Sequence, residues 1–418
     1  MLCRHKLHDA QKNRAEMRIH MKKKLLLIGL MVLVVSALTG CNSAGKYDND
    51  GKKYFSQGKY EEAADSFLKA IDQNPNRTDY YIDYGMTLTA LGRYEDAIAQ
   101  FDQAYQDKDI GIIKKNNKKL LRGKGIAYFY SGQYEKALEQ FELALQVNEL
   151  SELNRDILYY KGSSLRAIGS YDLAVEAYDA ILSEDEALVP AILLRANCYQ
   201  IMGDYENSLQ DYERVIALEP DNYDGYFGKY SVLLEQGRET EAAEVLEETA
   251  VIGGETLEDR FNQAKLHYYQ GDPEAALTEL EESYTDGFTE AYFYMGEIYR
   301  EKKDYQKAVY YYETFLSEEK DPGPAVYNQL GYCLMKQGNH SKAIEYLEKG
   351  ITINPAGAIK TLEKNEIIAY EGIGEFATAL DKLREYLAVY PDDSKAVREE
   401  AFLKTRTIST ESKEGEER

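Results

Sequence analysis

The hydrophobic and polar positions of the chain follow one pattern that returns about every 34 residues. In one copy, Gly132 is followed by Tyr134, Ala137 and Phe141, with polar residues between them. Residues three or four apart share one face of a helix, so this spacing predicts an amphipathic helix that begins at the aromatic residue. The glycine can adopt the left-handed conformation that ends the preceding helix. Each copy therefore predicts a helix–turn–helix unit.

Ten copies of this pattern stand in register along the chain. The small residue after the turn is alanine in every copy except one, where Ser208 replaces it. A stack of such units extends its core with every added copy, so we predict one repeat array over residues 47–393. Glu239 and Pro273 replace the turn aromatic, which makes 223–290 the weakest stretch of the array. The ten turn positions are Tyr60, Tyr94, Tyr134, Tyr171, Tyr205, Glu239, Pro273, Tyr305, His340 and Phe376.

The period and the repeated spacing of glycine, aromatic and alanine resemble the tetratricopeptide repeat (TPR) family over residues 47–393. The resemblance implies an all-α fold, a right-handed superhelical solenoid of about ten stacked TPR helix-turn-helix repeats. It also implies that the first helix of each repeat lines a concave groove that binds a partner. The inward-facing positions give the candidate partner-binding residues Arg122, Tyr159, Asn197, Phe227, Phe261, Tyr268, Phe293, Arg300, Asn328 and Tyr332.

The candidate groove leaves two kinds of ligand open. Similar co-chaperones clamp a terminal carboxylate with a set of Lys and Asn residues, which the groove positions here do not reproduce. The aromatic residues suit a protein or an extended peptide, because aromatic side chains are frequent hot spots of interfaces. They equally suit stacking on the sugar rings of a glycan or cell-wall polymer.

The start of the chain reads as an export signal. Basic residues at 21–24 precede an apolar run, Leu25 to Leu38, which is shorter than the ~20 residues of a membrane span and typical of a signal peptide. The following Leu38-Thr39-Gly40-Cys41 resembles a bacterial lipobox. The resemblance implies a lipoprotein signal peptide over 21–40, lipidation of Cys41, and a lipidated tether over 41–46.

Both ends of the chain extend beyond these elements. The polar residues 1–20 precede a complete signal peptide, so they are either non-native or an extended n-region. After the array, Ser394 can cap a last helix over 394–405 with Lys and Arg on its surface. The polar stretch 406–418 is expected to be a disordered tail.

Charge and motif content narrow the function. The net charge is −23, which argues against nucleic acid as a partner because phosphate binding needs a basic face. After Cys41 only His267 and His340 remain, and no catalytic or metal-binding spacing is present. The stretch 372–377 spells a dinucleotide-type glycine string, but it lies between two predicted helices rather than after a strand. We therefore expect no enzyme activity, cofactor or metal.

These observations combine into one leading hypothesis. The chain is expected to be a lipid-anchored scaffold of the bacterial cell membrane, facing outside the cytoplasm, that binds protein or extended peptide in its groove. Envelope complex assembly is a setting that fits this description. The alternative is a receptor for glycan or cell-wall polymer. The sequence leaves the partner's identity, the number of membranes and the oligomeric state open.

Overall fold

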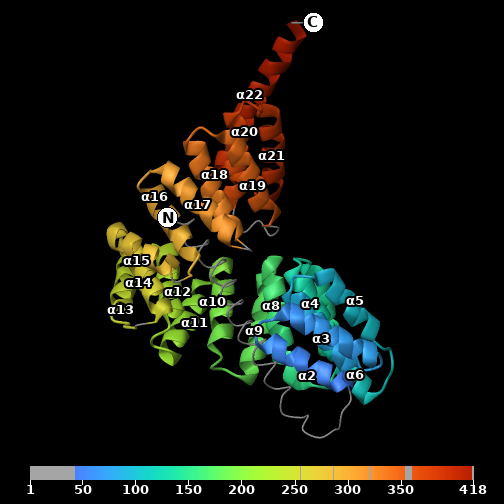
Figure 1. The fold of residues 1–418 in the computed structure, drawn as a ribbon. Coiled ribbons are helices and arrows are strands. Elements are labelled where there is room, and N and C mark those ends of the chain that lie inside the picture. Colours follow the sequence, from blue (N-terminus) through green and yellow to red (C-terminus); the bar gives the residue numbers. More distant parts are fainter. Residues whose placement is uncertain (1–42, 255, 286, 320–321, 354–359, 417–418) are drawn as a thin grey trace. The chain divides into compact units, whose positions relative to one another are not determined.

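The computed structural model describes residues 43–416 except 255, 286, 320, 321 and 354–359, with side chains described as far as residue 407. This part of the chain is built from α-helices, with one short 3-10 helix and no strand (Figure 1). The predicted all-α repeat architecture is confirmed, because the described helices form ten pairs and a last single helix. Residues 1–20, the signal peptide and Cys41 lie outside the described residues.

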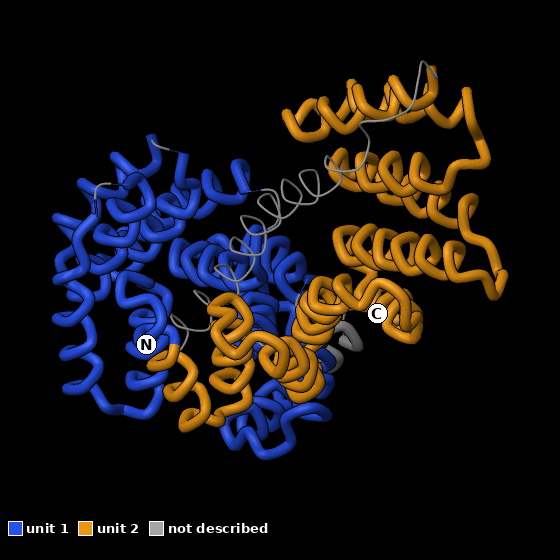
Figure 2. Tube along the Cα trace, turned by 90° about the horizontal axis from the view of Figure 1, so that it is seen from below, with its two compact units in different colours: residues 1–12, 215–418 blue, residues 13–214 orange. Residues whose placement is uncertain are grey.

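The chain forms two compact units, which in the described part are residues 43–214 and 215–416 (Figure 2). The boundary falls inside the continuous helix α11 (Tyr205–Leu218). In the unit 43–214, first and second helices of the repeats alternate along the chain, and a 3-10 turn precedes α8. Its other helices are α2 (Ser43–Ser56), α3 (Tyr60–Gln73), α4 (Thr78–Ala90), α5 (Tyr94–Ala104), α6 (Gly111–Tyr130), α7 (Tyr134–Gln146), η1 (Ser151–Leu153), α8 (Asn154–Ala167), α9 (Tyr171–Glu184) and α10 (Val189–Met202).

The unit 215–416 continues the same alternation through five further repeats. Its helices are α12 (Tyr223–Glu235), α13 (Glu239–Thr249), α14 (Leu257–Gln270), α15 (Pro273–Thr285), α16 (Glu290–Glu301), α17 (Tyr305–Glu318), α18 (Pro324–Lys336), α19 (His340–Thr352), α20 (Lys360–Gly372), α21 (Phe376–Val389) and α22 (Ser394–Glu416). Every second helix begins at the turn position that the sequence pattern identifies.

The turns between paired helices have one recurring geometry. Gly132 has φ 77°, and the next amide, that of Gln133, donates to the Tyr128 carbonyl at 2.9 Å. This left-handed residue closes the first helix as the sequence predicts. Nine of the ten turns place a glycine there, and in the tenth Lys303 adopts φ 61°. A side chain in this conformation is strained, so the turn before α17 stores a local cost.

The paired helices approach closely where glycine faces an aromatic ring. A Cβ added to Gly125 of α6 would lie 2.5 Å from Cε1 of Phe141 of α7, which is fully buried. Gly85 with Phe101, and Gly162 with Tyr178, repeat this contact in neighbouring repeats. Such contacts join the two helices of a repeat through one ring.

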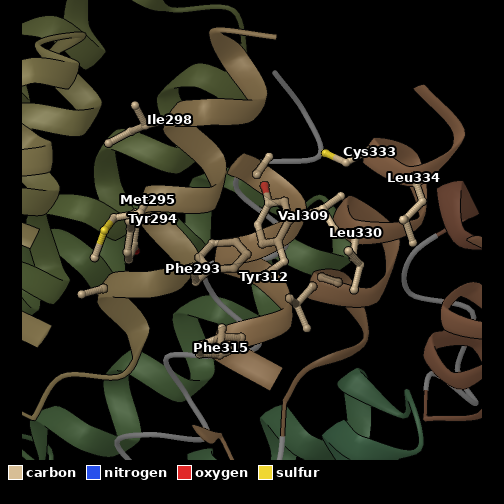
Figure 3. Packing of buried hydrophobic residues seen from close by; sticks show 14 of the residues in the cluster. Phe293, Tyr294, Met295, Ile298, Val309, Tyr312, Phe315, Leu330, Cys333 and Leu334 are labelled. Carbon is tan, nitrogen blue, oxygen red and sulfur yellow. The ribbon is translucent and has the colours of Figure 1, made fainter. Parts of the chain in front are cut away.

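Aromatic and aliphatic side chains fill the space between repeats. Figure 3 shows this packing in the unit 215–416, where Phe293 and Tyr312 lie among Phe315, Leu330 and Cys333. The Phe293 ring is 5.9 Å from that of Tyr312 and 6.0 Å from that of Phe315. Both cysteines of the described residues, Cys198 and Cys333, are free and buried.

Two boundaries differ from those expected. Helix α2 begins at Ser43, inside the tether expected over 41–46, because Ala44 packs into the core of the first repeats. Helix α22 continues to Glu416, past the expected end at 405 and through most of the stretch expected to be disordered. Its first part is fixed by buried Leu403, and no proline or glycine interrupts the sequence before residue 415.

Candidate functional site

Polar side chains connect each first helix of the unit 43–214 with the next first helix. We call these contacts the first-helix bridges. They replace part of the apolar packing at every junction between successive first helices of this unit. The bridges are Lys52–Asp83 at 3.3 Å (α2 to α4), Lys119–Asp79 at 3.8 Å (α6 to α4), Arg122–Asp156 at 2.5 Å (α6 to α8) and Arg166–Asn197 at 2.6 Å (α8 to α10).

The unit 215–416 carries three first-helix bridges of its own, each joining one first helix to the next. Their chemistry differs from that of the unit 43–214, because two are hydrogen bonds between neutral side chains and one joins a phenol to a carboxylate. They are Tyr223–Gln263 at 2.7 Å (α12 to α14), Tyr268–Glu301 at 3.0 Å (α14 to α16) and Asn328–Asn365 at 2.8 Å (α18 to α20).

The bridge at the start of the array contains two carboxylates around one amine. The Lys52 Nζ donates to Asp48 Oδ2 at 2.8 Å and lies 3.3 Å from Asp83. Burial is the largest influence on Asp83, and despite Lys52 it raises the pKa of Asp83 to about 6. The second carboxylate oxygen of Asp48 is buried without a hydrogen-bond partner. This cluster therefore holds more negative charge than Lys52 neutralises.

The Arg122–Asp156 bridge is internally compensated. Burial opposes the charge of Arg122, but the charge and hydrogen bond of Asp156 outweigh it and raise the pKa of Arg122. Sequence reasoning identified Arg122 and missed its partner Asp156, which lies at the start of α8.

The structure places the ten predicted partner-binding residues on first helices, but most lie inside the packing. Phe227 is 1% exposed, and the Phe261 ring stacks on Phe288 with 5.0 Å between centroids. The expectation of aromatic rings exposed in a groove is wrong for these residues, because their rings fill the space toward the neighbouring repeat. Eight are buried, Arg122, Tyr159, Asn197, Phe227, Phe261, Tyr268, Phe293 and Asn328, and two are half-buried, Arg300 and Tyr332.

Several polar residues of the first-helix faces escaped the prediction. Arg166 bonds to the predicted Asn197, and Glu301 bonds to the predicted Tyr268. Glu297 bonds both Arg300 and Tyr312, at 2.6 and 2.5 Å. Comparing the repeats position by position would have found Arg166, because Arg300 occupies the same place in a later repeat.

Two further properties bear on function. Among the described residues, no group of three or more His, Cys, Asp or Glu could hold a metal ion. Within the same residues, no helix is long and apolar enough to cross a membrane. The apolar run of the predicted signal peptide lies outside that part of the chain.

Comparison with known proteins identifies the family. Tetratricopeptide repeat sequences match residues 51–111, 122–188, 189–222, 261–325 and 324–356, which together make up more than half of the chain. The chain belongs to the tetratricopeptide repeat family and is a scaffold-type TPR protein.

The individual relatives are distant. The mouse DnaJ homolog subfamily C member 7 is 21% identical over 335 residues, covering 66% of this chain and 67% of the mouse protein. The DnaJ protein P58IPK homolog B of rice is 24% identical over 213 residues, covering 47% of this chain and 44% of the rice protein. The chain thus spans two thirds of one relative and less than half of the other. Among solved structures, yeast Tom70 is 15% identical, with a TM-score of 0.47 over 98% of this chain and 96% of Tom70.

Proposed function

We propose that this chain is a non-enzymatic, lipid-anchored scaffold outside the bacterial cytoplasm that binds a protein or an extended peptide along its first helices. The observation that carries this proposal is the row of first-helix bridges. Every junction between successive first helices of the unit 43–214 contains a polar or ionic pair. Membership of the TPR family supports the same class of function.

The bridges are better suited to recognition than to stability. Replacing a buried ion pair by apolar residues of similar size is often neutral or stabilising, because the pair must first be stripped of water. Arg122 and Asp156 have side chains that are only 10% and 17% exposed, so they bear that cost. A polar ligand chain lying along the first helices can exchange hydrogen bonds with such groups. Apolar packing cannot offer this exchange.

The position of the first helix supports a site close to the membrane. Helix α2 begins at Ser43, two residues after Cys41 in the sequence. If Cys41 carries acyl chains, the first repeat follows its anchor almost directly. Stable anchoring needs more than one acyl chain, as lipoprotein diacylation would supply. A partner at the membrane surface or in an envelope complex fits this arrangement.

The glycan alternative loses its main support. Stacking on a sugar needs an accessible ring face, and the rings of Phe227, Phe261 and Phe293 are buried in the packing between repeats. No other observation favours a glycan ligand, so binding of protein or peptide is the function proposed.

Capture from native membranes tests the binding face. We compare wild type with the double variant Arg122→Met/Asp156→Leu, which keeps volume while removing the bridge. The control is Lys342→Met/Glu313→Leu, which removes a pair that joins the second helices α19 and α17 at 2.5 Å. We expect the first double variant to lose captured proteins that the control retains. Equal captured sets for all three proteins would reject the proposed face.

The anchor is tested separately by Cys41→Ser. We expect this variant to leave the membrane fraction, whereas wild type stays in it. Chains that begin at Met21 should still be exported and lipidated if residues 1–20 are not part of the native protein. A Cys41→Ser chain that remains membrane-bound would contradict the lipid anchor and leave the binding face unaffected.

A further inference from the structure

The array contains the same four-residue arrangement twice, once in each unit. In each copy an arginine near the end of a first helix lies beside a tyrosine of the paired second helix and a cysteine of the next first helix. The first copy consists of Arg166, Tyr178 and Cys198, with Ser163 one turn before the arginine. The second copy consists of Arg300, Tyr312 and Cys333, with Glu297 one turn before the arginine.

The second copy is electrically complete. Arg300 donates to Glu297 at 2.6 Å, and the hydroxyl of Tyr312 donates to the same carboxylate at 2.5 Å. The Glu297 side chain is 2% exposed, so this carboxylate is held inside the packing as a permanent counter-charge. Tyr312 and Cys333 are labelled in Figure 3 among the surrounding core residues.

The first copy lacks that carboxylate. Ser163 stands where Glu297 stands in the second copy, and its hydroxyl is 3.5 Å from the hydroxyl of Tyr178. Among the described residues, no Asp or Glu forms an ion pair with Arg166. Its strongest neighbours are phenols and a thiol, those of Tyr178, Cys198 and Tyr171. A guanidinium enclosed without a counter-ion is unfavourable.

Two hydrogen-bond donors of the first copy are unused. The Nη2 of Arg166 donates to Asn197 Oδ1 at 2.6 Å, which aligns the two side chains. The Nε of Arg166 and the Nδ2 of Asn197 are both buried without a partner, and Asn197 is 2% exposed. Arg166 itself is half-buried, so part of it reaches the surface. Two adjacent donors and an uncompensated positive charge match the two oxygens of a carboxylate.

We propose that Arg166 and Asn197 form a binding site for a carboxylate group of a peptide ligand, in place of the internal carboxylate that Glu297 provides in the second copy. This inference rests on the proposed binding along the first helices and assigns a ligand chemistry to one position on them. The carboxylate comes from an Asp or Glu side chain or from the end of the ligand chain. Arginine is suited to both because its planar group bonds two carboxylate oxygens at once.

The probes that test the site are three short peptides. Acetyl-Gly-Glu-Gly-amide carries only a side-chain carboxylate, acetyl-Gly-Gln-Gly with a free end carries only a terminal one, and acetyl-Gly-Gln-Gly-amide carries none. The measurement is the NMR shift of the Arg166 Nε–H signal in the full chain, assigned through its loss in Arg166→Lys. We expect a saturable shift with at least one carboxylate peptide and none with the neutral peptide. The peptide that shifts the signal identifies the source of the carboxylate.

The internal repeat supplies the matched variants. Ser163→Glu introduces the counter-charge of the second copy and should weaken carboxylate binding at least tenfold. Glu297→Ser removes that counter-charge and should make the Arg300 signal respond to the same peptides. Amide hydrogen exchange of α8 and α9 checks that Ser163→Glu is folded. If Glu297→Ser does not fold, the Ser163→Glu comparison decides alone.

Three results would overturn the proposal. They are a shift of equal size with the neutral peptide, an unchanged response in Ser163→Glu, and a response that never saturates, which indicates an adventitious anion only. Membrane capture distinguishes this failure from that of the proposed function. If Ser163→Glu captures the same proteins as wild type while Arg122→Met/Asp156→Leu loses them, the binding face stands and the carboxylate site falls. If the peptides bind but neither variant changes capture, the reverse holds.

Discussion

The contact between Gly125 and Phe141 gives the sharpest prediction about how a repeat is held together. Glycine inside a helix is less favourable than alanine by about 0.5–1 kcal/mol, so Gly125→Ala should stabilise α6 if nothing else changed. However, the new Cβ would lie 2.5, 2.7 and 2.9 Å from three ring atoms of Phe141. Overpacking of this kind costs about 1–3 kcal/mol. We therefore expect Gly125→Ala to destabilise α6 and α7 by about 0.5–2 kcal/mol.

The same substitution should reverse its sign when the ring is removed. Phe141→Ala alone costs about 3–5 kcal/mol, because the ring is fully buried. In that background the added Cβ has no ring to meet, so only the helix preference remains and Gly125→Ala should stabilise by about 0.5–1 kcal/mol. The two residues are therefore coupled by about 1–3 kcal/mol, well above the error of a double-mutant cycle.

Native-state hydrogen exchange of the α6 and α7 amides measures these changes locally, which suits an array whose repeats unfold in part. The control is Gly132→Ala, because Gly132 has φ 77° and no atom within 4 Å of an added Cβ. It should destabilise by about 1–2 kcal/mol in both backgrounds. Equal effects of Gly125→Ala with and without Phe141 would refute the proposed role of the glycine–ring contact.

Three further predictions follow from individual residues. Burial raises the pKa of Asp83 to about 6, so the unfolded chain releases this proton at lower pH, and the free energy of unfolding of α2–α4 should fall as pH rises from about 4 through 6; exchange rates in Asp83→Asn should lack this part of the pH dependence, and an unchanged profile would contradict it. Burial raises the thiol pKa of Cys198 to about 11 and that of Cys333 to about 12, so iodoacetamide at pH 8 should label both only after denaturation, as mass spectrometry of the native and unfolded chain would show. Lys303→Gly should raise the stability of α16–α17 by up to about 1 kcal/mol, because the left-handed conformation at φ 61° is strained for lysine; exchange protection that drops instead would show that the lysine side chain matters more than the strain.

The repeated pattern was sufficient to predict where helices pair and turn. Gly132 and Tyr134 carry local information, because a left-handed residue must end one helix before the next begins, and the structure confirms this at each turn. Ala137 is fully buried at the crossing of the two helices, as its small size predicts. These features depend on residues close in the sequence, so one copy of the pattern contains them.

The exposed part of the first helices could not be predicted in the same way. Whether Phe227 or Phe261 faces solvent depends on how far the next repeat covers it, and that depends on side chains about one repeat away. Large rings at these positions reach across to that neighbour and become buried. Arg166 was missed because its significance lies in an absence, the serine at 163 where a carboxylate stands in the later copy.

The end of the array shows a similar limit. The polar composition after residue 405 is typical of disorder, yet α22 extends to Glu416. Composition counts the residues that could pack, whereas a helix can also continue from a buried start such as Leu403. The prediction that 223–290 is the weakest stretch still stands as a prediction, and exchange rates across both units would test it.

Site-specific photocrosslinking in native membranes tests the central claim most directly. A crosslinking amino acid replaces either Tyr332, which is half-buried on the first helix α18, or Tyr310, which is 62% exposed on the second helix α17. If the first helices bind the partner, Tyr332 should give discrete protein or peptide adducts and Tyr310 should give none, despite its greater exposure. Adducts from Tyr310 alone, or the same adducts from both positions, would contradict binding along the first helices.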